Sequence, residues 1–236
     1  TLMILCNPQN PAGNIWDCET LARIGALCKQ YDVIVVSDEI HCDLTKPGTE
    51  YIPFASVDDT CRDISVTCIA PTKTFNLAGL QTAAVYAENS ILHHRMWRQL
   101  NTDEVAEPNA FAIQATIAAF QYGEEWLDEL REYVEKNKQY VTEFLQEKIP
   151  LIHPVAGDAT YLMWLDCRKI TESGRQFVKF IRKTSGLYVS GGNQYGRGGE
   201  GFLRVNVATS KLVVEDGMQR LYESVDAWLK EEKISK

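Results

Sequence analysis

The sequence predicts an α/β domain built in layers, followed by a smaller α+β domain. Segments of strand length alternate with segments of helical periodicity in the first half of the chain, which is typical of a sheet covered by helices. The region 124–148 is helical in pattern, heavily charged and long enough to join two bodies. We therefore place the domain boundary there, with residues 1–128 in the larger domain and residues 129–236 in the smaller one.

The first elements predict a right-handed βαβ unit. Residues 2–6 are apolar and form a candidate buried strand, and the segment 7–13 is dense in asparagine, proline and glycine, as a turn would be. Apolar residues recur at helical spacing through 17–30, and 33–37 is a continuous, mostly β-branched run. Such a run suits a parallel strand covered on both faces, and a helix joins such strands with a right-handed crossover.

The remaining elements follow the same patterns. Further strands are predicted at 64–70, 83–87, 160–166 and 202–208, and further helices at 90–101, 110–122, 173–185 and 214–230. The chain starts at Thr1, without methionine, and enters an apolar strand at once. We therefore expect an N-terminally truncated chain that holds only part of its functional site, with an ordinary domain whose methionine was processed as the alternative.

The composition narrows the class of function. With 45% apolar residues among 236, the chain can bury a sizeable core, and its net charge of -8 disfavours nucleic acid as a partner. No apolar stretch reaches the roughly eighteen residues of a transmembrane helix, so no membrane partner is expected. The seven cysteines form no C-x-x-C pair, which argues against a disulfide framework and a zinc site. These observations favour a small-molecule enzyme of the reducing cytoplasm, without a bound metal.

Two charged residues follow predicted parallel strands, at the edge where open α/β sheets bind their ligands. Asp38 follows the strand at 33–37, and its carboxylate could hold a protonated ring nitrogen or simply cap the next turn. Lys73 follows the strand at 64–70 among apolar and hydroxyl side chains. Such surroundings destabilise the ammonium form and favour an amine that can form a Schiff base, although a solvated loop lysine is the alternative.

The order of these segments resembles that of the fold-type-I pyridoxal-phosphate enzymes of aminotransferase class I/II. The matching landmarks are Asn10 in Asn-Pro-Ala-Gly, Asp38 with His41 three residues later, Lys73 in its loop, and Arg204 in an alternating apolar strand. They cover essentially the whole chain. The resemblance implies the three-layer αβα large domain of fold type I, N-terminally truncated, with a smaller C-terminal α+β domain.

The same resemblance implies pyridoxal 5'-phosphate as the cofactor and a role for each landmark. It implies that Lys73 forms the Schiff base with the cofactor, that Asp38 pairs with the pyridine nitrogen and that Asn10 bonds the phenolic oxygen. Thr72 and His41 are the further cofactor contacts. Arg204 is expected to bind the substrate α-carboxylate through its bidentate fork, with a surface salt bridge as the alternative. We also expect a cis peptide bond before Pro11, which would aim Asn10 at the ring.

The sequence is more similar to the cystathionine β-lyase-like carbon-sulfur lyase branch of this family. The segments Ser-Asp-Glu-Ile-His at 37–41 and Lys-Thr-Phe-Asn-Leu-Ala-Gly-Leu-Gln at 73–81 stand there in this form. Common aminotransferases usually have tyrosine at the position of His41, and they bind the phosphate with an arginine and a serine at the positions of Gln81 and Ala70. Other phosphate contacts are therefore expected from an upstream segment.

The resemblance thus implies a carbon-sulfur β-lyase that acts on amino acids such as cystathionine or cysteine and gives thiol, pyruvate and ammonia. An aminotransferase is the first alternative, and a non-catalytic regulatory binding protein with the same fold is the second. A homodimer is the expected assembly.

Overall fold

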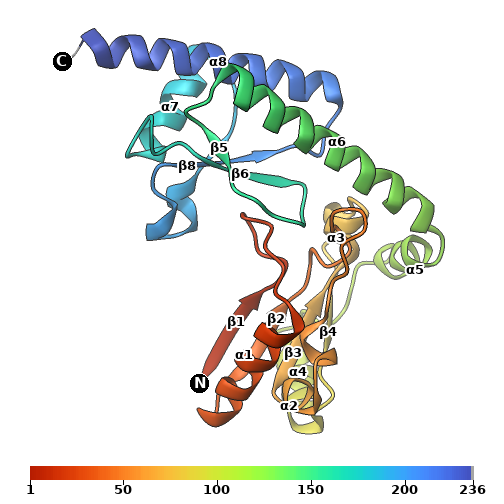
Figure 1. Cartoon of the computed structure of the whole chain (residues 1–236). Coiled ribbons are helices and arrows are strands. Elements are labelled where there is room, and N and C mark those ends of the chain that lie inside the picture. The colour runs from red at the N-terminus through yellow and green to blue at the C-terminus, as the bar shows by residue number, and fades with distance from the viewer. Residues whose placement is uncertain (235–236) are drawn as a thin grey trace. The chain divides into compact units, whose positions relative to one another are not determined.

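The structure is a computed structural model that describes residues 1–234, with side chains described through Glu231. It consists of two compact units (Figure 1). Unit 1 comprises residues 1–10, 14–131 and 158–160, and unit 2 comprises residues 11–13, 132–157 and 161 onward. The predicted charged helix is α6, Glu124–Lys148, and its residues are divided between the units.

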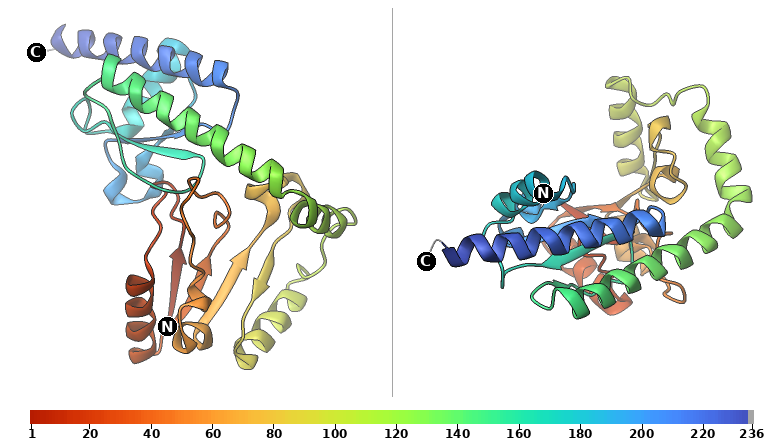
Figure 2. Two further views of the ribbon diagram at one scale, coloured as in Figure 1. Left: turned by 45° about the vertical axis from the view of Figure 1, so that its right-hand side comes forward. Right: turned by 90° about the horizontal axis from the view of Figure 1, so that it is seen from above.

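Unit 1 is built on a four-stranded sheet with the order β1-β2-β3-β4. The strands are β1 (Leu2–Cys6), β2 (Ile34–Asp38), β3 (Ser65–Ile69) and β4 (Ala84–Tyr86). The first three are parallel, whereas β4 pairs antiparallel with β3 (Figures 1 and 2). Helix α1 (Cys18–Gln30) completes the predicted βαβ unit, and Asp17 caps it by accepting a hydrogen bond from the Thr20 N–H.

The core of unit 1 lies on one face of this sheet. Its buried members come from β1, β2, α1 and the segment between β2 and β3: Leu5, Leu21, Cys28, Val35, Phe54, Cys61 and Ile64. Successive strand residues point to opposite faces. Asp38 therefore lies on the face opposite Val35, together with its register partners Cys6 and Cys68.

Several short helices of unit 1 were not predicted. They are η1 (Phe54–Ser56), α2 (Asp59–Asp63), α3 (Pro71–Thr74) and η2 (Ala78–Leu80). Lys73 thus lies on a helical turn rather than in an open loop, because Pro71 has the backbone angle that starts a helix at its first position. The predicted longer helices are α4 (Ser90–Thr102) and α5 (Ala112–Tyr122).

Unit 2 contains an antiparallel sheet with the order β5-β6-β8-β7. Its strands are β5 (His153–Pro154), β6 (Leu162–Asp166), β7 (Ser190–Gly191) and β8 (Phe202–Asn206). Helices α7 (Gly174–Ser185) and α8 (Lys211–Ile234) contact each other and bury apolar side chains such as Phe177 and Leu221. Within residues 1–234, no helix has the length and apolar character needed to cross a membrane.

Candidate active site

Near the carboxyl ends of β1, β2 and β3, one residue from each strand pairs with its neighbour to form a row, and Asp38 is the middle residue of this row. Asp38 pairs in register with Cys6 on one side and Cys68 on the other. One carboxylate oxygen, Oδ1, accepts a hydrogen bond from the Ile40 N–H at 3.2 Å. The turn-capping role considered from the sequence is therefore real, but a carboxylate has two oxygens. Asp38 can cap its turn through one oxygen and offer the other to a ligand.

Lys73 reaches the same sheet edge because α3 begins directly after β3 (Figure 1). The Thr74 hydroxyl, which is fully buried, donates a hydrogen bond to Asp43 Oδ2 at 2.9 Å. This bond ties the lysine-bearing turn to the segment that follows Asp38. The Lys73 side chain is half-buried, and in the part of the chain that the structure describes its amine forms no hydrogen bond or ion pair. The amine is thus available for a covalent bond.

His41 and Thr72 accompany these two residues. His41 is only 3% exposed and begins the turn whose Leu44 N–H donates to the His41 carbonyl at 3.0 Å. Thr72 is half-buried beside Lys73. The structure therefore brings four predicted residues, Asp38, His41, Thr72 and Lys73, to the segments at one edge of the unit 1 sheet.

The Asn-Pro segment reaches this edge in a different way from the one expected. The cis peptide bond precedes Pro8, not Pro11, so the expected cis bond after Asn10 is wrong. Asn7, which precedes Pro8, is held in three places: its N–H donates to the Asp38 carbonyl, its Oδ1 accepts from the Trp16 N–H, and its carbonyl accepts from the Tyr51 hydroxyl. The chain turns where Asn7 is anchored.

Asn10 itself lies close to the end of β1. Its backbone N–H acts to lower the pKa of the thiol of Cys6, which is the register partner of Asp38 and donates to the Pro8 carbonyl at 3.7 Å. Burial raises the pKa of the Cys6 thiol above its ordinary value, and the charge of Asp38 acts in the same direction. Asn10 is thereby placed next to the row that contains Asp38.

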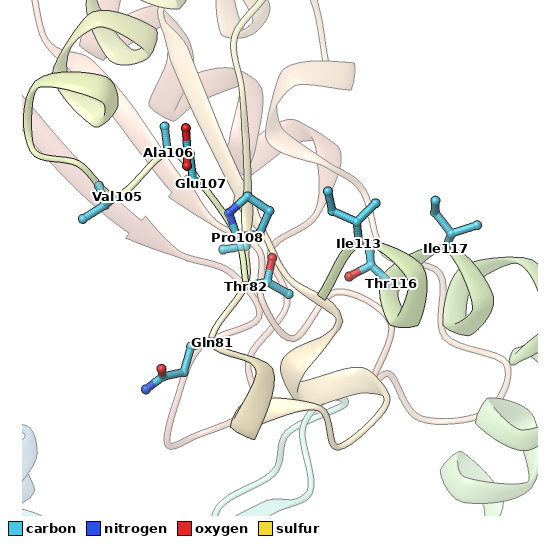
Figure 3. A pocket seen from close by; sticks show the side chains of 10 residues that line it. Gln81, Thr82, Val105, Ala106, Glu107, Pro108, Ile113, Thr116 and Ile117 are labelled. Carbon is cyan, nitrogen blue, oxygen red and sulfur yellow. The ribbon is translucent and has the colours of Figure 1, made fainter. Parts of the chain in front are cut away.

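Two positions depart from the common phosphate site, Ala70 directly before α3 and Gln81 after η2. Ala70 is buried and offers no side-chain donor. Gln81 is exposed, has a left-handed backbone conformation (φ 48°) and lines a cavity of about 340 Å³ together with Thr82, Glu107 and Thr116 (Figure 3). Neither Lys73 nor Asp38 lines this cavity, so it is not the site of the predicted chemistry.

Arg204 lies on β8 of unit 2, opposite Trp164 of β6. Its guanidinium stands 5.0 Å from the centre of the Tyr195 ring, and that ring contacts Trp164 edge-on. A cation over an aromatic face is stabilised. Unit 2 thus presents Arg204 on an aromatic support.

Sequence reasoning missed two polar residues of unit 1, Glu39 and Tyr51. Glu39 is 2% exposed and accepts hydrogen bonds from the Ser37 hydroxyl and the Phe54 N–H. The Tyr51 hydroxyl donates to the carbonyl of Asn7 at 2.8 Å. The sequence signal that could have revealed Glu39 is its position as a second acidic residue, directly after the buried strand that ends in Asp38.

The unit 1 residues fit pyridoxal phosphate. An amine without a competing partner, a carboxylate with one oxygen unused by the fold, and a neighbouring hydroxyl match an aldehyde, a basic ring nitrogen and a phosphate oxygen in turn. No cluster of three or more His, Cys, Asp or Glu side chains suited to a metal occurs among the described residues.

Comparisons with known proteins point the same way. The model of the family "Aminotransferase class I and II" matches residues 1–221. The chain is 42% identical to cystathionine beta-lyase PatB of Bacillus subtilis and 32% identical to protein MalY of Escherichia coli, covering 94% and 96% of this chain and 57% of each relative. The pyridoxal-phosphate-bound C-S lyase of Staphylococcus hominis superposes with a TM-score of 0.87 at 33% identity, over 95% of this chain and 55% of that one. The chain spans just over half the length of these relatives.

Proposed function

Because this chain belongs to the aminotransferase class I and II family, we propose that it carries the catalytic lysine of a pyridoxal-phosphate-dependent carbon-sulfur β-lyase. Its substrates are amino acids such as cystathionine or cysteine, and its products are a thiol, pyruvate and ammonia. The observation that carries the proposal is the placement of Asp38 and Lys73 at the same edge of a parallel sheet. The similarity to cystathionine beta-lyase PatB supports the choice of reaction.

The proposed site residues have two tasks: most of them hold the cofactor, and Lys73 also moves a proton. Lys73 bonds the cofactor covalently, Asn10 donates to the phenolic oxygen, Thr72 contacts the phosphate, and His41 borders the ring. Asp38 keeps the pyridine nitrogen protonated. When bound, the cofactor supplies an electron-accepting ring conjugated to the substrate Cα.

With the substrate in place, the neutral amine of Lys73 would remove the proton from the substrate Cα. Loss of that proton allows the bond between Cβ and sulfur to break, and the electron pair leaves with the thiolate. Arg204 binds the substrate α-carboxylate through two parallel hydrogen bonds, which a lysine could not provide. These roles use every predicted site residue once.

The experiment that tests the proposal measures pyruvate released from cystathionine by the full-length protein loaded with pyridoxal phosphate. No keto acid is added, so that only elimination can yield pyruvate. We expect steady pyruvate formation, and none from the Lys73→Ala variant. If the protein instead consumes amino acids only when a keto acid is present, it is an aminotransferase and the lyase proposal is wrong.

We also propose a cellular compartment, an oligomeric state and domain bounds for the protein. We place the protein in the cytoplasm, since all seven cysteines carry free thiols. A homodimer is supported by the apolar side chains that α5 and its neighbours leave exposed, such as Phe111, Phe120 and Tyr122. Sedimentation of the full-length protein tests this, and a monomer at micromolar concentration contradicts it.

Residues 1–128 form the cofactor-binding large domain and residues 129–236 the smaller domain.

A further inference from the structure

The Tyr51 hydroxyl has no task in the proposed mechanism, yet it reaches the segment that carries Asn10. It donates a hydrogen bond to the Asn7 carbonyl at 2.8 Å, although the two residues are 44 positions apart in the chain. Asn7 is fully buried and lies one residue past the last paired position of β1, which is Cys6 with Asp38. A buried carbonyl without a donor is costly, so this one needs a donor from outside the strand ladder. Tyr51 supplies it.

Asn7 closes the base of the loop formed by residues 7–16. Its N–H donates to the Asp38 carbonyl at 3.1 Å, and its side-chain Oδ1 accepts from the Trp16 N–H at 3.2 Å. The first bond ties the loop to the end of β2, and the second joins its two ends. Asn10 lies within this loop, three residues after Asn7. The placement of Asn7 therefore limits where Asn10 can lie beside the sheet.

Tyr51 is suited to act as a fixed point. Ile52 and Phe54, which follow it closely in the chain, pack in the core of unit 1, and Phe54 is fully buried. Burial raises the pKa of the Tyr51 hydroxyl above its ordinary value, and the charges of Glu39 and Cys42 act in the same direction. The hydroxyl therefore keeps its proton at neutral pH and remains a hydrogen-bond donor.

We propose that Tyr51 is a positioning residue, which holds Asn7 through its hydroxyl and thereby places Asn10 for its contact with the phenolic oxygen of the cofactor. The contact between Asn10 and the cofactor rests on the proposed function, whereas the fixing of the loop by Tyr51 does not. Tyr51 thus acts on the cofactor only through the loop.

The first consequence concerns the loop alone. Tyr51→Phe removes the hydroxyl and keeps the ring, so the buried Asn7 carbonyl loses its donor while the packing around the ring is retained. The loop should then open toward water more often, and hydrogen exchange of residues 7–16 should become about tenfold faster.

The second consequence concerns the bound cofactor. A donor to the phenolic oxygen favours the ionised form of that oxygen. If Asn10 is displaced, the pH-dependent change in the absorbance of the bound cofactor should therefore move to higher pH. A loss of stability elsewhere in the protein would not produce this shift.

The test uses Tyr51→Phe, Asn10→Ala and the double variant of the full-length protein. Tyr133→Phe is the matched control, because the Tyr133 hydroxyl also bonds a backbone group, accepting from the Lys211 N–H at 2.8 Å, but it lies in unit 2. Hydrogen exchange is measured by mass spectrometry without cofactor. The absorbance of bound pyridoxal phosphate is then titrated with pH.

We expect both single variants to move the absorbance change to higher pH. Tyr51→Phe should add no further shift in the Asn10→Ala background, because two changes that act through one contact are not additive. Exchange of residues 7–16 should rise in Tyr51→Phe and stay at the wild-type rate in Tyr133→Phe.

The inference is overturned if Tyr51→Phe leaves the exchange unchanged, if it unfolds the whole chain, or if the two absorbance shifts add in the double variant. It is also overturned if Asn10→Ala moves the absorbance change and Tyr51→Phe does not. A wild-type protein that fails to bind pyridoxal phosphate refutes the proposed function instead, and the exchange measurement then still decides whether Tyr51 holds the loop.

Discussion

Replacing Asp38 by asparagine isolates the charge of this side chain from its structural role. Asp38 Oδ1 accepts the Ile40 N–H at 3.2 Å, and an asparagine oxygen can accept the same bond. The pairing of β2 with β1 and β3 uses backbone groups only. The variant should therefore fold normally and keep the turn, while it loses the negative charge that holds the ring nitrogen protonated.

The expected loss can be given a magnitude. One preorganised electrostatic contact is worth about 3 to 4 kcal/mol of activation free energy, so kcat should decrease roughly 10²- to 10³-fold. Cofactor binding should persist, because Lys73 still forms its covalent bond. Elimination from cystathionine is followed as pyruvate, and bound cofactor is measured by absorbance in the same samples.

The matched control is Asp17→Asn, since Asp17 caps α1 through the Thr20 N–H and asparagine is an equally good cap. This control should keep wild-type activity. Near-normal elimination by Asp38→Asn with bound cofactor would refute the role assigned to the Asp38 charge. A similar loss of elimination activity in Asp17→Asn would show that such substitutions act by disturbing the fold and not by removing the charge beside the cofactor.

Three further predictions concern single residues. Borohydride reduction of the loaded protein should label Lys73, and peptide mapping that finds the adduct on another lysine contradicts the assignment. Arg204→Lys should raise KM for cystathionine at least tenfold with a smaller effect on kcat, because an ammonium lacks the bidentate fork; unchanged KM argues against carboxylate binding there. Thr74→Val should lower the free energy of unfolding by about 1 to 3 kcal/mol, since Asp43 loses a buried hydroxyl donor, and urea titration would disprove this if the stability stayed the same.

The longer elements could be predicted because their patterns span several turns or a full strand. Asp17 and the apolar spacing after it marked α1, and the charged periodicity of 124–148 gave the bounds of α6. The short helices α2 and α3 could not be found in this way, because four or five residues are too few to show a helical period. Their existence depends on caps and on Pro71.

The placement of Asp38 and Lys73 was predictable because it depends on strand ends. Parallel neighbouring strands bring their carboxyl ends to one edge, so both residues were expected at that edge once the strands were recognised. The bond between Thr74 and Asp43 could not be inferred, because it joins a helical turn to a segment whose path is set by tertiary contacts.

The misplaced cis bond and the missed network have the same physical origin. Both Asn-Pro pairs in the segment look alike in the sequence, and nothing local distinguishes Asn7 from Asn10. What distinguishes them is that Asn7 is held by Asp38, Trp16 and Tyr51, the last of which is 44 residues away along the chain. The geometry of the Asn-Pro segment is thus decided by buried polar groups that a pattern of apolar residues does not reveal, and loss of the Tyr51 hydroxyl should disturb the site although Tyr51 belongs to none of its motifs.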